Sequence, residues 1–138
     1  FFGINEKPTS SKDPFALRRN AIGLLRIIIE NKLSIQLKDI LNYTIIAYEE
    51  QGVKFTNKFT TKEILIFLRE RFKNLLKDKK IRSDIIEAVD SSHTGNDFLS
   101  LYKKCSIVNK NISLSVAIHS IRIIKLITPK LTFINIIC

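Results

Sequence analysis

The sequence predicts an all-α protein, an irregular helical bundle of about five or six helices. Apolar residues recur three or four positions apart along most of the chain, which is the spacing of one face of a helix. Only four glycines and three prolines interrupt these stretches, and hydrophobic residues make up 45% of the chain, which is enough to close a core. The length of 138 residues allows one domain or one piece of a larger protein.

The first two helices are predicted from residues that favour helix ends. We expect the first helix from Pro14 to about Asn31. Asp13 can accept hydrogen bonds from its free N–H groups, and Pro14 suits the first helical position because the N–H that proline lacks would be unpaired there. A second helix is expected to open at Ser34 and to end at Gly52, because glycine tolerates the left-handed conformation that often follows a helix.

The third helix has the clearest start. Thr60 and Glu63 have the spacing of a capping box, in which each side chain satisfies a backbone N–H of the other residue. An apolar stripe follows, and Lys79 and Lys80 suit the negative end of the helix dipole. We therefore predict a helix from Thr60 to about these two lysines.

The C-terminal part is predicted as three separate helices. A short helix spans Ser83–Val89, and another begins at about Asp97. A last helix spans Ile112–Ile127 and stops before Pro129, because proline disfavours continuation. No state is assigned to residues 130–138.

Positive charge is the main functional signal. The chain has 23 Lys and Arg against 13 Asp and Glu, a net charge of +10 and a pI near 9.8. This excess excludes an acidic tail or a calcium buffer, and it favours a polyanionic partner such as nucleic acid or an anionic membrane. Between residues 69 and 82 cations are opposed only by Glu70 and Asp78, although such runs are commonly solvated helix faces. The candidate binding residues are Arg69, Arg71, Lys73, Lys77, Lys79, Lys80 and Arg82.

No complete catalytic or metal-binding constellation is present in the sequence. Neither His93 nor His119 has a Cys, Asp or Glu at ligand spacing, and no glycine-rich phosphate loop, nucleophile elbow or zinc pattern appears. Cys105 lies on an inward stripe and is expected in the core, whereas Cys138 is terminal. We predict no catalytic residue, no metal ligand and no cofactor in this chain, and two cysteines without a disulfide scaffold favour the cytosol.

A membrane segment is not expected. The most apolar stretch, residues 112–127, is interrupted by His119, Arg122 and Lys125, and a spanning helix needs about 20 mainly apolar residues. The first residues also lack the pattern of a signal peptide. A basic amphipathic helix on a membrane surface is the remaining membrane alternative.

One stretch is far more specific than the charge pattern. Residues 7–19 read K-P-T-S-S-K-D-P-F-A-L-R-R and residues 23–27 read G-L-L-R-I. This closely resembles the bacterial glycyl-tRNA synthetase beta subunit, whose pattern is K-P-T-G-S-x-D-P-F-A-L-R-R. Two later segments resemble the same family in its order, I-F-L-R-E-R-F at residues 66–72 and S-D-I-I-E-A-V at residues 83–89.

The resemblance implies a two-subunit glycine–tRNA ligase, a class II aminoacyl-tRNA synthetase of the cytoplasm. In that family the alpha subunit carries the catalytic part and uses ATP, magnesium and glycine, and the beta subunit mainly holds tRNA(Gly). By this resemblance residues 1–31 correspond to the end of an HD-like helical domain. Residues 32–95 correspond to a helical linker region, and residues 96–138 to the start of a truncated or altered anticodon-binding helical domain.

The resemblance fails after about residue 112. There the family continues with A-x-K-R-x-x-N-I, but residues 115–122 read S-V-A-I-H-S-I-R. A shifted reading frame, a degraded gene or an early stop would each produce such a change. Two alternatives to tRNA binding therefore stay open, a structural module that contacts the alpha subunit and a nonfunctional remnant of a split gene.

Overall fold

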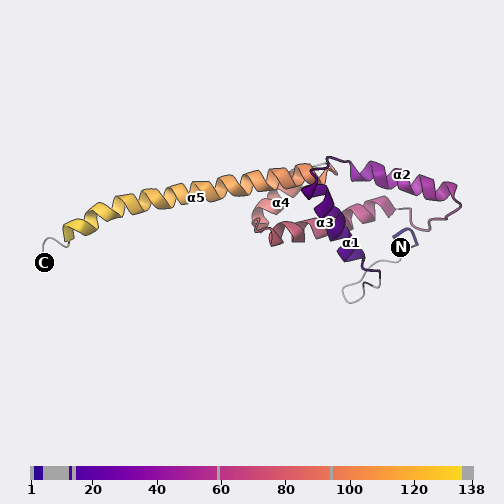
Figure 1. The fold of residues 1–138 in the computed structure, drawn as a ribbon, viewed down its shortest axis with the longest axis horizontal. Helices are drawn as coiled ribbons and strands as arrows, with labels where there is room; N and C mark the ends of the chain where they lie inside the picture. Colours follow the sequence, from indigo (N-terminus) through magenta and orange to yellow (C-terminus); the bar gives the residue numbers. More distant parts are fainter. Residues whose placement is uncertain (1, 5–12, 14, 59, 94, 135–138) are drawn as a thin grey trace.

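The computed structural model describes residues 2–4, 13, 15–58, 60–93 and 95–134, with side chains as far as Val116. Over these residues the chain forms helices and no strand, which confirms the all-α prediction. The elements are η1 Phe2–Ile4, α1 Leu17–Glu30, α2 Leu37–Glu50, α3 Thr60–Asp78, α4 Ser83–Ser92 and α5 Phe98–Ile134. Helices α1 to α4 and the start of α5 gather at one end, and the rest of α5 extends away from them as a single rod (Figure 1).

The core lies where α1, α3, α4 and the first turns of α5 meet. Leu25, Phe72, Ile86 and Cys105 come one from each of these helices, and each is at most 1% exposed. The ring of Phe72 packs edge-on against that of Phe98 with centroids 5.1 Å apart. Cys105 is therefore the small core residue that its position predicted, and the core is filled largely by Leu and Ile.

Helix α1 is capped as predicted but begins later. The carboxylate of Asp13 accepts hydrogen bonds from the backbone N–H groups of Leu17 and Arg18, at 2.8 and 3.1 Å. The helix starts at Leu17 rather than Pro14 because Ala16 has a φ of 52°. This left-handed conformation does not occur inside a right-handed helix. Pro14 itself lies outside the described residues.

The start of α2 differs from the prediction. The helix begins at Leu37, and the residue before it, Gln36, makes no side-chain cap. Ser34 does not cap α2 because its hydroxyl donates to the carboxylate of Asp97 at 2.6 Å, which ties this loop to the start of α5. At the other end Gly52 has a φ of 83° and follows the helix, as predicted.

Helix α3 begins and ends close to the predicted residues. Thr60 is its first residue, but the predicted capping box is not formed, because the Thr60 hydroxyl donates to the carbonyl oxygen of Asn57 at 2.7 Å. The carboxylate of Glu63 accepts from the side-chain amide of the same asparagine at 2.6 Å. The helix ends at Asp78, directly before the two lysines that predicted its end.

The predicted fifth and sixth helices are one continuous helix, and the predicted stop before Pro129 is wrong. Helix α5 has 37 residues and runs through Pro129 to Ile134. The stretch between the two predicted helices contains neither glycine nor proline, so nothing in it ends a helix. Pro129 removes one backbone N–H donor, a cost of about 3 kcal/mol that a long helix can carry. The predicted start at about Asp97 is confirmed, because its carboxylate accepts from the N–H groups of Leu99 and Ser100.

Candidate nucleic-acid interface

The seven candidate cations lie along α3 and in the turn that joins it to α4. Arg69, Arg71 and Lys73 stand in the middle of α3, and the other four follow at its C-terminal end and before α4. The two groups differ in their contacts: the three cations in the middle of α3 have acidic partners within the fold, whereas the other four are exposed.

Arg69 and Lys73 hold α4 against α3. The Nε of Arg69 lies 2.7 Å from Oδ1 of Asp90, and the Nζ of Lys73 lies 2.9 Å from Oδ2 of the same carboxylate. Lys73 also pairs with Glu87 at 3.0 Å. Hydrogen bonds to Asp90 first, and then to Glu87, raise the pKa of Lys73 above its ordinary value. Both cations therefore have carboxylate partners within the fold.

The Arg69 side chain makes a second contact that fixes its direction. Its terminal nitrogen donates to the carbonyl oxygen of His93 at 3.2 Å. The imidazole of His93 is partly buried, and this burial lowers its pKa, with the charges of Lys104 and Arg69 adding to the effect. The end of α4 is thus tied to α3 through backbone as well as side chain.

Arg71 covers an aromatic pair. Its guanidinium lies 4.6 Å from the centre of the Phe67 ring, and one nitrogen lies 3.2 Å from Oε2 of Glu70. Phe67 packs in turn against Phe2 of η1, with centroids 5.3 Å apart. With its side chain only 18% exposed, Arg71 presents little of its guanidinium to a partner.

The remaining four cations are exposed and form what we name the α3–α4 corner, which consists of Lys77, Lys79, Lys80 and Arg82. Lys80 has a φ of 64°, so the chain turns sharply here and the four side chains follow one another around the bend. Within the described part of the chain, Lys77 and Lys80 have no carboxylate at ion-pair distance. Arg82 pairs with Asp84 through two nitrogens, at 3.1 and 2.6 Å, and this bond lowers the pKa of that carboxyl.

The corner lies against α5. The ammonium of Lys79 is 5.9 Å from the centre of the Tyr102 ring, and the backbone N–H of Arg82 donates to the side-chain oxygen of Asn109 at 3.2 Å. Each of these α5 residues is followed directly by a lysine, Lys103 or Lys110, and both lysines are exposed. Three elements thus contribute positive charge at this end of the bundle.

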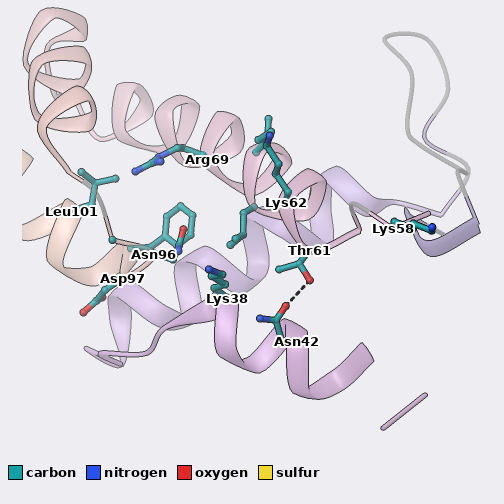
Figure 2. A pocket seen from close by; sticks show the side chains of 13 residues that line it. Lys38, Asn42, Lys58, Thr61, Lys62, Arg69, Asn96, Asp97 and Leu101 are labelled. Atoms are coloured by element: carbon teal, nitrogen blue, oxygen red, sulfur yellow. Dashed lines mark hydrogen bonds between the residues drawn. The ribbon is translucent and has the colours of Figure 1, made fainter. Parts of the chain in front are cut away.

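A second basic region lies near the other end of α3, around a cavity of about 550 Å³. Lys38, Lys58, Lys62 and Arg69 line it from α2, the loop before α3, and α3 itself (Figure 2). Of these four cations, only Arg69 is among the residues predicted from the sequence. That prediction rested on a run of cations close together in the chain, whereas this group is brought together by the packing of α2 against α3.

Metal ligands do not gather among the described residues, where no three His, Cys, Asp or Glu side chains lie close enough to share an ion. In the same part of the chain, no helix is long and apolar enough to cross a membrane.

Comparisons with known proteins point to one family. A family profile described as glycyl-tRNA synthetase beta subunit matches residues 1–91. The chain is 37% identical over 109 residues to the glycine–tRNA ligase beta subunit of Clostridioides difficile (strain 630), covering 79% of this chain and 15% of that protein. It is 47% identical over 88 residues to that of Shewanella denitrificans, covering 64% of this chain and 12% of that protein.

The beta subunit of Syntrophomonas wolfei gives a similar result, with 35% identity over 102 residues, 74% of this chain and 15% of that protein. The chain thus spans a small part of the length of the curated relatives it matches.

Proposed function

Because the chain belongs to the glycyl-tRNA synthetase beta subunit family, we propose that it helps to hold tRNA(Gly) for glycine–tRNA ligase in the cytoplasm. The observation that carries this proposal is the α3–α4 corner, where four exposed cations stand around one bend. A tRNA backbone presents closely spaced phosphates, which attract such a surface and release counterions on contact.

Within the corner the four cations have different tasks. Lys77 and Lys80 carry charges without an ion-pair partner among the described residues, so they can bind phosphate without breaking a contact. Lys79 lies near the Tyr102 ring of α5 and Arg82 pairs with Asp84, so each already has a contact within the fold. Arg82 can exchange the exposed Asp84 carboxylate for a phosphate, because guanidinium binds both groups in the same forked geometry.

Arg69, Arg71 and Lys73 act mainly on the fold in this proposal. Arg69 and Lys73 are paired with Asp90, and Arg71 covers Phe67, so each would lose a protein contact on moving to a phosphate. They contribute to the positive field that attracts tRNA, and the corner makes the direct contacts.

Bond formation belongs to the partner subunit in this proposal. The alpha subunit would supply the site for ATP, magnesium and glycine, and the present chain would position the tRNA. The described residues do not fit a magnesium site of their own, since no acidic cluster is assembled among them.

The test is the binding of tRNA(Gly) to the full chain at increasing salt. If all four corner cations contact phosphates, the logarithm of the binding constant falls with the logarithm of salt concentration with a slope of about −3 to −4. The triple variant Lys77→Gln, Lys79→Gln, Lys80→Gln should reduce this slope by about 2 to 3. A matched variant that removes three exposed cations elsewhere, Arg26→Gln, Lys32→Gln, Lys54→Gln, should retain most of it.

Two results would overturn the electrostatic mechanism. One is the absence of binding at low salt, and the other is an affinity that does not change with salt. Equal losses in the two triple variants would show that net charge, rather than the corner, attracts the tRNA.

A second candidate function is an interaction module that contacts the alpha subunit. It is favoured by the outer face of α2, where Ile40, Tyr43 and Ile46 are 48%, 77% and 53% exposed. Co-purification with an alpha subunit that survives Lys77→Glu, Lys79→Glu, Lys80→Glu but is lost on Tyr43→Glu would favour this function.

A further inference from the structure

The cavity at the N-terminal half of α3 has a distinct chemistry from the corner. Lys62 beside the cavity and Lys77 in the corner stand about 22 Å apart along the helix axis, at 1.5 Å per residue. The cavity measures about 550 Å³, within the range of roughly 300–1,000 Å³ of small-molecule sites. It is bounded by α2, α3 and the start of α5 (Figure 2).

The rim of this cavity carries uncompensated positive charge. Lys38, Lys58 and Lys62 are exposed and have no carboxylate at ion-pair distance in the described part of the chain. The one acidic side chain of the lining, Asp97, is already bound by the hydroxyl of Ser34 and by two backbone N–H groups of α5. It stays charged but makes no ion pair with these lysines in the described part of the chain, and the lining cations outnumber it. The rim therefore keeps a net positive charge, and an anion is the ligand that it favours.

Inside the rim the lining is partly apolar. Leu65, Phe98 and Leu101 line the cavity, and the last two are only 5% and 3% exposed. A flat, weakly polar group would cover this apolar surface better than a bare phosphate would. The ligand therefore has an apolar part as well as a charge.

Amide side chains complete the lining. The hydroxyl of Thr61 donates to the side-chain oxygen of Asn42 at 2.8 Å, which joins α3 to α2. Because this bond uses the oxygen, the two N–H donors of Asn42 remain for a ligand, and Asn96 lines the same cavity. Asparagine amides pair well with the edges of nucleobases.

We propose that this cavity binds a nucleoside 5′-phosphate, with the base against Leu65, Phe98 and Leu101 and the phosphate at the lysines of the rim. The same chemistry can come from an unpaired nucleotide of an RNA or from a free nucleotide. The inference does not require the corner to bind tRNA, since the two sites share none of the residues that carry them.

The experiment titrates the full chain with AMP and follows backbone amide signals by NMR. We expect saturable shifts at Asn42, Thr61 and Asn96. The double variant Lys38→Gln, Lys62→Gln should weaken AMP binding by about tenfold, since charge-assisted hydrogen bonds are about twice as strong as neutral ones. The matched variant Lys32→Gln, Lys54→Gln should keep the wild-type affinity, and so should the corner variant Lys77→Gln, Lys79→Gln, Lys80→Gln.

Adenosine, inorganic phosphate and a short single-stranded RNA complete the design. Adenosine and phosphate should each bind more weakly than AMP, because each lacks one half of the ligand. Tighter binding of the RNA than of AMP assigns the site to an unpaired RNA nucleotide, and the reverse order assigns it to a free nucleotide. The proposal is overturned if neither AMP nor the RNA gives saturable shifts, if phosphate binds as tightly as AMP, or if both double variants lose affinity equally. Retained AMP binding without tRNA binding would reject the proposed function alone.

Discussion

Asp90 is the residue on which the contact between α3 and α4 depends most. Its carboxylate is only 15% exposed and lies between Arg69 and Lys73, which are one helical turn apart on α3. Two cations around one partly buried carboxylate compensate the cost of removing it from water. The pair Lys73–Glu87 extends the same cluster toward the surface.

The raised pKa of Lys73 predicts how stability depends on pH. Below the ordinary lysine value of 10.5 the ammonium is protonated in both the folded and the unfolded chain, so its contribution is complete. Above this value the unfolded chain loses the proton first, and the free energy of unfolding falls until the folded-state pKa is passed. Between about pH 9 and 11.5, the free energy of unfolding measured with urea should therefore fall less steeply for Lys73→Gln than for the wild type.

The control for this prediction is Lys77→Gln, which removes a lysine of the same helix without an ion-pair partner in the described chain. Its pH profile should follow that of the wild type. A Lys73→Gln profile that also follows the wild type would contradict the prediction.

The ion pairs of the basic run could not be predicted from the sequence. In the sequence, Arg69, Lys73, Lys77 and Lys80 are equivalent members of one basic run. They differ in the structure because Asp90 and Glu87, which lie on another helix, face only the first two. A partner that is distant in the chain leaves no signal in a single sequence, so the run was predicted as one surface.

Three helices end in the same way, with a residue of positive φ directly after the final turn. These residues are Lys32 after α1, Gly52 after α2 and Lys80 after α3, with φ values of 55°, 83° and 64°. In each case the next residue donates its N–H five residues back, as Leu33 does to Ile28 and Ile81 to Leu76. This is the Schellman arrangement, in which glycine is the favoured residue because it has no Cβ.

Replacing lysine by glycine at such an end should stabilise the protein. We expect Lys32→Gly to raise the free energy of unfolding by about 1 kcal/mol, because the left-handed conformation costs a residue with a Cβ about that much. Gly52→Ala should lower it by a similar amount. Urea unfolding checks both variants.

The control is Lys103→Gly in the exposed part of α5, which should destabilise by about 1 kcal/mol because glycine is unfavourable inside a helix. If Lys32→Gly also destabilises, the interaction of the lysine side chain outweighs the backbone strain.

Helix boundaries were predictable where the signal is local. Asp13, Thr60 and Asp97 mark helix starts because their side chains bond to groups a few residues away. The prediction that the second helix opens at Ser34 was wrong because the Ser34 hydroxyl binds Asp97, which is far along the chain. The predicted helix end before Pro129 was wrong because a proline weakens a helix without having to end it. The cavity was not predictable, since its lining is assembled from three segments.

At the scale of the whole molecule, the net charge of +10 opposes folding. Like charges are closer together in the folded chain than in the unfolded chain, so their repulsion lowers the free energy of unfolding. Salt screens this repulsion as well as any attraction to a nucleic acid.

Salt should therefore have opposite effects on stability and on tRNA binding. We expect the Tm to rise between about 0.1 M and 1 M NaCl, over which the Debye length falls from roughly 10 Å to 3 Å. The triple variant of the corner has three charges fewer, so its Tm should rise less with salt. Thermal unfolding monitored by circular dichroism measures both values of Tm. A Tm that falls with salt in the wild type would mean that the ion pairs around Asp90 outweigh the repulsion.

Helix α5 packs into the bundle through its first turns, where Phe98, Leu99, Leu101 and Cys105 are buried, and the helix continues beyond the bundle (Figure 1). Its 37 residues make it about 55 Å long, at 1.5 Å per residue. A short buried segment at one end of α5 therefore sets the direction of the whole helix. A tilt of about 5° at these buried side chains would move its far end by roughly 5 Å over that length. A small repacking around Phe98 would therefore cause a larger displacement at the far end of α5.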